Sequence, residues 1–348
     1  WSSDVCSSDL ITWSPHLLRL YSGGVIANVS VNPEVNANSE ILVNWTVSGT
    51  ESYTVMAQLV SVVEAGSKTI ETSSSTLHNV EFAGFGSWEL QDSLMLDGYI
   101  LIGGTSFLYA DGKDITISGD WTNYGAFVPG DNTVTFSDAS GTQLVTSEIS
   151  GTQFNDFVHS GSATLQLSGN GIKIGGNFAN SGGTFNADGK TVTFNGSGIL
   201  NTITASNMAF YAVNFDNASG VWTLQANLSV SDDFTISAGT VSAGTYTITV
   251  GGDWNHTGGT FDYGTSTVNL TGSDNTITVS TSGSYETNIG FYSLLIDSGA
   301  YYTPTAGFSL AEYGTLTLKG ELYIPYGETV MVYGGSVVMD GGVLKSGW

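Results

Sequence analysis

One segment of this chain occurs in near-copies, and the repetition restricts the folds open to it. Residues 252–273, GDWNHTGGTFDYGTSTVNLTGS, agree at nine positions without a gap with residues 176–197, GNFANSGGTFNADGKTVTFNGS. Residues 119–140 form a third copy with a shorter first turn, and a weaker copy begins at Gly320. Each copy has an aromatic residue, a glycine-containing turn, a second aromatic residue, another turn and a Thr/apolar alternation. The repeat therefore predicts units that stack on one another.

The spacing of apolar residues favours a solenoid. A second repeat type, residues 210–237 and again from Phe291, alternates with the first and also ends in a strand pattern. Apolar strand centres recur at roughly 20 residues, as from Phe234 to Trp254, and such periods belong to solenoids. Since helical patterns are lacking, we predict an all-β parallel β-helix with two or three short strands per coil. A string of small β-sandwich domains is the alternative, because the copies are far enough apart to fill such domains.

Alternation along the strands predicts which side chains line the interior. Residues 190–194 and 245–250 alternate Thr or another polar residue with apolar ones. Successive side chains of a strand point to opposite faces, so the apolar set faces inward and the Thr set outward. The predicted inward residues are Val192, Phe194, Tyr246, Ile248 and Val250.

The first aromatic residue and the glycines of each copy have structural interpretations. Trp121, Phe178 and Trp254 are predicted to stack in the coil interior or at its corners. The glycine pairs at 182–183 and 258–259 are predicted to supply positive φ at those corners.

The N-terminal part differs from the repeats. Residues 1–10, WSSDVCSSDL, resemble translated sequencing-adapter read-through and are predicted to be non-native; they hold the single cysteine. Residues 11–75 contain several strand candidates and predict a small antiparallel β-sandwich-like segment, or else a cap on the solenoid. Residues 76–348 are predicted to be the β-helix repeat domain, and the pattern indicates a fragment cut at its C-terminal end.

The charge is strongly acidic. There are 31 acidic against seven basic residues, a formal net charge of −24. This charge repels phosphate backbones, so nucleic acid is not an expected partner, and it attracts divalent cations. No run of about 18 apolar residues exists, so no membrane span is predicted in this fragment.

The Gly-Asp/Asn-Trp/Phe, Gly-Gly-Thr-Phe and Thr-Val-x-Phe/Leu strings of residues 76–348 resemble the repeats of large β-solenoid surface proteins of bacteria and archaea. Many of these proteins are adhesin-like. The resemblance implies secretion, a stalk-like shape and a role outside the cell, with polysaccharide or protein ligands. It implies no catalytic motif.

An enzyme is the main alternative, because β-helices also serve polysaccharide hydrolases and lyases. Asp232 and Asp233 resemble the paired carboxylates of such hydrolases, but the chain lacks the Gly-His-Gly and Arg-x-Lys strings that accompany them. We therefore interpret the pair as residues of a turn before Phe234 and predict a protein without catalytic residues.

The sequence predicts no cofactor, but it allows a bound calcium ion. Carboxylates in tight turns provide weak candidate ligands. These are Asp111, Asp114, Asp131 and Asp262. The histidines, His16, His78, His159 and His256, lack the clustered spacing of zinc sites. His256 lies where the other copies have Asn123 and Asn180, and it is predicted to be a surface turn residue.

Two further sets of residues are candidates for surface roles. Asn-x-Ser/Thr sequons predict N-glycosylation. They begin at Asn28, Asn44, Asn195, Asn217, Asn227, Asn255 and Asn269. Tyr301, Tyr302, Tyr323 and Tyr326 could stack on sugars, but we favour the interpretation that they fill the core.

Together these features predict a non-enzymatic extracellular repeat protein, a stalk or adhesin segment at the cell surface. The alternatives are a carbohydrate-active β-helix enzyme and a subunit of a surface layer or filament. In the last case, the ends of the coils would mediate self-association.

Overall fold

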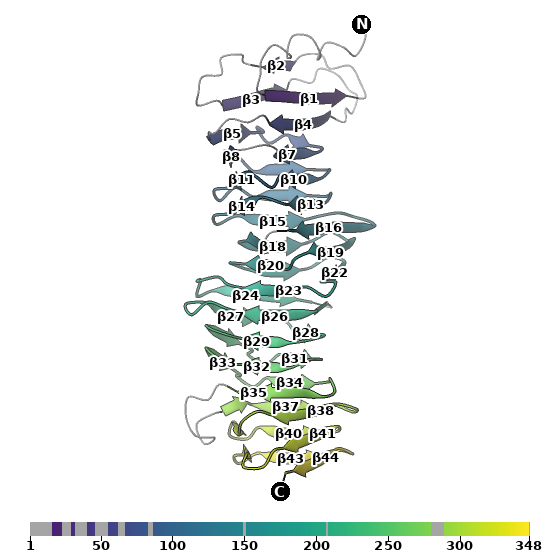
Figure 1. The fold of residues 1–348 in the computed structure, drawn as a ribbon, viewed down its shortest axis with the longest axis vertical. Coiled ribbons are helices and arrows are strands. Elements are labelled where there is room, and N and C mark those ends of the chain that lie inside the picture. Colours follow the sequence, from purple (N-terminus) through teal and green to yellow (C-terminus); the bar gives the residue numbers. More distant parts are fainter. Residues whose placement is uncertain are drawn as a thin grey trace. The chain divides into compact units, whose positions relative to one another are not determined.

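The chain folds into strands only, throughout the residues that the structure describes. This computed structural model describes residues 16–22, 29–31, 40–45, 55–61, 67–82, 86–148, 151–206, 208–279 and 289–347. Those residues form no helix, and from residue 67 onward they wind as a parallel β-solenoid, which has about 13 turns (Figure 1). The all-β, parallel β-helix prediction is confirmed. The alternative of separate sandwich domains is wrong, because the repeats pair in parallel with the coils before and after them.

The solenoid divides into two compact units. Unit 1 comprises residues 1–172 and 182–184, and unit 2 comprises residues 173–181 and 185–348. The strands β20 (Ile172–Ile174) and β22 (Thr184–Asn186) contain residues of both units.

The first strands of unit 1 are paired in two ways. β1 (His16–Ser22) is antiparallel to β4 (Val55–Ser61), and β2 (Val29–Val31) is antiparallel to β3 (Glu40–Trp45). β3 also pairs in parallel with β5 (Ser67–Glu71), so β2 and β3 form one end of a six-stranded sheet. Whether residues 11–75 are a sandwich-like segment or a cap stays a prediction, and residues 1–10 lie outside the described part.

Each coil of unit 1 contributes strands to three sheets. One sheet has β6 (Thr76–Leu77), β9 (Leu94–Leu96), β12 (Ile115–Ile117), β15 (Thr133–Phe136) and β18 (Asp156–His159). The second has β7 (Val80–Phe82), β10 (Ile100–Ile102), β13 (Trp121–Asn123), β16 (Thr142–Ser147) and β19 (Thr164–Gly169). The third continues from β5 through β8 (Gly86–Leu90) and β11 (Ser106–Tyr109) to β14 (Ala126–Val128). β17 (Thr152–Phe154) is the end strand of a further sheet.

Unit 2 has the same organisation. One sheet has β21 (Phe178–Asn180), β24 (Asn201–Ala205), β27 (Val221–Leu224), β30 (Thr240–Ser242) and β33 (Thr260–Asp262). The second has β23 (Thr191–Phe194), β26 (Ala212–Phe215), β29 (Phe234–Ile236), β32 (Trp254–His256), β35 (Asn275–Thr278), β38 (Tyr301–Pro304), β41 (Glu321–Ile324) and β44 (Val343–Ser346). The third has β25 (Ala209–Phe210), β28 (Leu228–Val230), β31 (Thr247–Val250), β34 (Thr267–Leu270), β37 (Ser293–Ile296), β40 (Thr315–Leu318) and β43 (Ser336–Met339). A short sheet has β36 (Ile289–Phe291), β39 (Phe308–Leu310) and β42 (Val330–Val332).

Parallel register places like residues above one another. Ile248 lies between Leu228 of the coil before and Val268 of the coil after. Val192, Phe194, Ile248 and Val250 are fully buried, as the alternation predicts. Tyr246 is only half-buried and precedes β31, so its inward prediction is wrong. Its amide donates to the carbonyl of Ala243 at 3.1 Å, which makes it part of the turn rather than of the alternating strand.

Aromatic residues fill the interior of both units. Trp121, Phe178 and Trp254 are fully buried, which confirms their predicted inward stacking. In unit 2 the rings of Trp254 and Phe234 stack with centroids 4.6 Å apart and planes 7° apart. Large rings in register on neighbouring coils thus add directional stacking to the burial of apolar area.

The glycine pairs are needed mainly because their backbone lies close to carbonyl oxygens of the neighbouring coil. Only Gly259 of the two pairs has a positive φ, 69°, so the prediction for Gly182, Gly183 and Gly258 is wrong. A Cβ at Gly183 would lie 2.1 Å from the carbonyl oxygen of Ala163, and one at Gly258 would lie 2.2 Å from that of Ser237. Coils about 4.8 Å apart leave no room for a side chain over the neighbouring carbonyl.

Candidate functional site

The second residue of the GDW-type units joins consecutive coils. The Oδ1 atom of Asp120 accepts a hydrogen bond from the Leu144 amide at 2.8 Å. Asn177 accepts from the Thr202 amide at 2.8 Å, and Asp253 accepts from the Thr276 amide at 2.7 Å. No role for this position was predicted from the sequence. The role could have been inferred because all three copies have a residue with a side-chain oxygen acceptor, Asp or Asn, at this position.

The acidic pair that resembled a hydrolase site lies at such a contact. Asp233 directly precedes β29, and its Oδ1 atom accepts from the Asp253 amide at 2.8 Å. Burial raises the pKa of Asp233, the amide hydrogen bond opposes this, and the charges of Asp232 and Asp253 raise it further. A hydrogen bond to Asp232 is the main cause of the raised pKa of Tyr211. The pair therefore has a contact between coils and a phenol partner, in agreement with the turn interpretation.

The candidate calcium ligands are dispersed among turns. Asp114 accepts from the Thr133 amide at 2.8 Å, and Asp262 accepts from the Ser242 hydroxyl at 3.0 Å. Asp111 has a φ of 47° in a turn, and both Asp111 and Asp131 are exposed. Within the described ranges, no three His, Cys, Asp or Glu side chains gather in a way that could hold a metal ion. Calcium binding stays a prediction.

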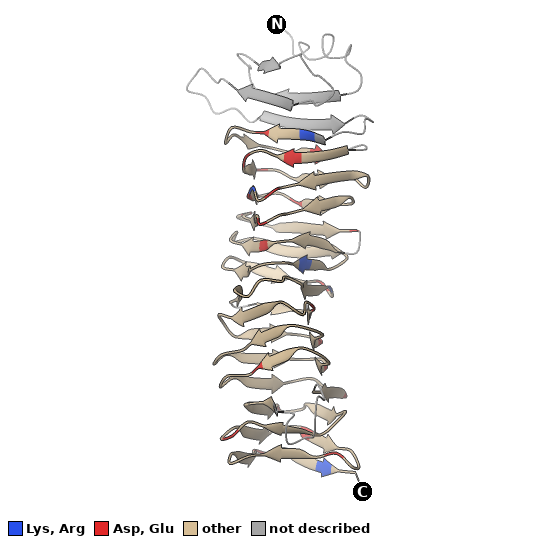
Figure 2. Cartoon of the chain, turned by 90° about the vertical axis from the view of Figure 1, so that its left-hand side faces the viewer, with Lys and Arg blue, Asp and Glu red and all other residues tan. Residues whose placement is uncertain are grey.

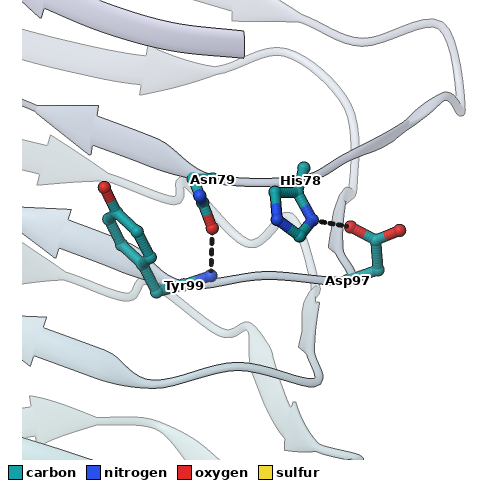
Figure 3. Close-up of polar contacts among 4 residues, drawn as sticks. All are labelled: His78, Asn79, Asp97 and Tyr99. Carbon is teal, nitrogen blue, oxygen red and sulfur yellow. Dashed lines mark hydrogen bonds and ion pairs between the residues drawn. The ribbon is translucent and has the colours of Figure 1, made fainter. Parts of the chain in front are cut away.

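His78 belongs to a polar cluster that links two coils of unit 1. Figure 3 shows His78 and Asn79 above Asp97 and Tyr99 of the next coil. The His78 Nδ1 atom lies 2.8 Å from an Asp97 carboxylate oxygen, and the Tyr99 amide donates to Asn79 at 2.9 Å. The Tyr99 hydroxyl donates to Glu81 at 2.5 Å, and this bond, with burial and the Glu81 charge, raises the pKa of Tyr99 to about 12. These contacts bind adjacent coils.

His256 is buried, so its predicted place on the surface is wrong. It is 8% exposed, and Asn123 and Asn180 at the equivalent position are also buried. The Nε2 atom lies 3.3 Å from the carbonyl oxygen of Gly259, whereas Nδ1 has no hydrogen-bond partner among the described residues. Burial lowers the pKa of His256, and the contact with Gly259 partly opposes this. Alternation counted from Trp254 would have placed His256 on the inner side.

The sequons differ in accessibility. Asn28 lies outside the described residues, and Asn44 lies in β3. Asn227 is exposed, and its Oδ1 atom accepts from the Thr247 amide at 2.9 Å, a bond that does not use its amide nitrogen. Asn217 is half-buried and donates that nitrogen to the Asn195 carbonyl at 2.7 Å. Asn195, Asn255 and Asn269 are half-buried. N-glycosylation stays a prediction, and Asn227 fits it best of these.

The C-terminal tyrosines divide between core and surface. Tyr302 is fully buried and donates its hydroxyl to the Gly252 carbonyl at 2.8 Å, which confirms the core interpretation for this residue. Tyr301 and Tyr323 are half-buried. Tyr326 is 80% exposed, so the core interpretation is wrong there, because it lies in a turn after β41.

A set of outward residues in unit 1, three aromatic and one aliphatic, was not predicted from the sequence. Phe107, Tyr109, Tyr124 and Val128 are between 39% and 46% exposed, and we call them the aromatic strip. The signal was in residues 106–109, SFLY, where apolar side chains occupy both faces of a strand instead of one.

Comparisons with protein-family models, curated proteins and solved structures gave no match to this chain. No helix suited to crossing a membrane occurs in the described residues. The class of the protein thus follows from its fold, a parallel β-solenoid, and its function has to be argued from its surface.

Proposed function

We propose that this chain is a non-enzymatic, extracellular repeat protein that acts as a stalk or adhesin segment at a cell surface. One observation carries the proposal: the recurring polar residue at the start of the GDW-type repeats bonds to the next coil. Asp120, Asn177 and Asp253 all bond to backbone amides in this way. A repeat selected for coil stacking suits extension and display, with ligands recognised by a few surface residues.

The competing role as a polysaccharide lyase or hydrolase is tested by turnover. The purified chain is incubated with neutral and acidic polysaccharides, with and without calcium, and reducing ends and unsaturated uronates are measured. We expect no product above that of a heat-denatured sample. Product that disappears in a D232N/D233N variant would assign catalysis to the acidic pair and overturn the proposal.

The adhesin role is tested separately by display. The chain is fused to a surface anchor on a bacterium that does not adhere, and an anchor without the chain serves as control. We expect adhesion to polysaccharide- or protein-coated surfaces to increase. Equal adhesion of both strains on every coating would contradict the adhesin role.

Self-association through coil ends, in a filament or surface layer, is the remaining alternative. Sedimentation velocity over a concentration series tests this role. Mass that rises with concentration supports a filament or surface-layer role, whereas a chain that stays monomeric contradicts it.

A further inference from the structure

The aromatic strip begins with two parallel rings on one strand. Phe107 and Tyr109 of β11 are 46% and 39% exposed, and the intervening Leu108 is fully buried. Their ring centroids are 6.5 Å apart and their planes differ by 20°. Both rings thus lie on the outward face of a parallel sheet with their planes close to parallel, and we call this pair of rings the platform.

The neighbouring strands give this platform an apolar side and a polar side. On β14, Val128 lies opposite Tyr109, and Tyr124 just before that strand is 43% exposed. On β8, Ser87 lies opposite Phe107, and Glu89 lies opposite Tyr109. Hydroxyl and carboxylate groups therefore flank the rings along one edge, where a ligand lying on the rings would meet them.

The size of the strip limits its occupant. A stable protein partner or second copy covers about 800 Å² on each side, which is much more than four side chains supply. Yet exposed aromatic residues in a contiguous patch commonly mark a binding site. The strip therefore fits a narrow ligand that lies along the sheet.

The charge around the strip further restricts the class of ligand. The strip has no basic residue, and Glu89 lies at its edge. In the view of Figure 2, acidic residues are scattered along the coils and basic residues are sparse, in line with the formal charge of −24. Anionic polymers would be repelled from such a surface, so the complementary ligand carries no negative charge.

We propose that the aromatic strip binds a neutral polysaccharide. The apolar faces of sugar rings pack on aromatic rings, and their hydroxyls bond to serine and carboxylate groups. Two parallel rings in line offer stacking positions for successive sugars of a linear chain. The inference deepens the proposed adhesin role, because it names the ligand class of one surface.

Affinity electrophoresis of the whole chain tests the site. Native gels contain hydroxyethyl cellulose, mixed-linkage β-glucan or glucomannan, with polygalacturonate as the anionic comparison. The test variant is F107A/Y109A. The control is Y211A/Y313A, which removes two rings that are 40% and 70% exposed in unit 2 and that are not candidates for sugar stacking. We expect a neutral polymer to retard the wild type and the control, and the apparent dissociation constant to rise about tenfold or more in the test variant.

A conservative variant and a folding check distinguish loss of ligand binding from loss of structure. Tyr109→Phe keeps the stacking surface and is expected to keep binding, while circular dichroism checks that F107A/Y109A retains its strands. If no neutral polymer retards the wild type, or if retardation is unchanged in a folded F107A/Y109A, the assignment is overturned. Cleavage of a bound polymer would instead contradict the non-enzymatic role and leave the binding site in place.

Discussion

At position 256 a buried imidazole replaces the buried amides of Asn123 and Asn180. Amides stay neutral at any pH of interest, whereas an imidazole can acquire a charge that the coil interior does not solvate. Burying a charged imidazole is unfavourable, and for this reason the pKa of His256 is lowered.

The shift predicts a loss of stability in mild acid. Above the ordinary value of 6.5, His256 is neutral in both states and adds no pH dependence. Below it, the unfolded chain binds the proton first, so the free energy of unfolding falls by up to about 1.4 kcal/mol per pH unit. The fall stops once the pH passes the folded-state pKa. Urea denaturation about one unit above and below the ordinary value measures it. The same pH dependence in His256→Asn would contradict the assignment.

The inward face of β23 is open to a paired test. Val192 is fully buried and Thr193 is half-buried on the other face. Val192→Asp places an unpaired carboxylate in the core and is expected to cost about 3–5 kcal/mol. Thr193→Asp is expected to stay within about 1 kcal/mol of the wild type. Thermal and urea unfolding compare the two, and equal effects would contradict the assigned faces.

At the scale of the strand and its turns, the Asp or Asn side chain at the start of each GDW-type coil joins two coils by accepting a hydrogen bond from a backbone amide of the next coil. Asp253→Ala leaves the Thr276 amide without its acceptor and is expected to cost about 1–3 kcal/mol of unfolding free energy. Asp253→Asn keeps the acceptor, as Asn177 does naturally, and removes a charge near Asp233. It is therefore expected to be neutral or stabilising. Urea denaturation of both variants decides, and equal destabilisation would show that charge matters more than the hydrogen bond.

Local patterns predicted the strands better than the contacts between them. The alternation around Val192 and Ile248 gave the buried face correctly, because burial follows from strand geometry alone. The bond from Asp120 to the Leu144 amide joins residues of different coils, and it depends on a register that one sequence does not reveal. The ring pair Phe107 and Tyr109 was missed because residues 106–109, SFLY, lie outside the recognised repeats. Three large apolar or aromatic residues in a row there do not show by alternation which of them face outward.

For the molecule as a whole, stacked repeats imply stability that is additive rather than all-or-none. Each coil bonds mainly to the coils before and after it, as β28, β31 and β34 do. Repeat proteins of this kind approach a one-dimensional chain of coupled units. Damage in one coil should then spread over a limited distance within a unit.

Val192→Ala tests this expectation, because it opens a small cavity in β23 without adding a charge. The loss of a buried side chain costs roughly 2 kcal/mol, enough to raise local opening but not to unfold the chain. Hydrogen exchange followed by mass spectrometry should show lower protection in β23 and in its partner β26. Protection in β37 and β40, several coils further along unit 2, should not change. A uniform decrease over all of unit 2 would instead show that its coils unfold together, as one cooperative block.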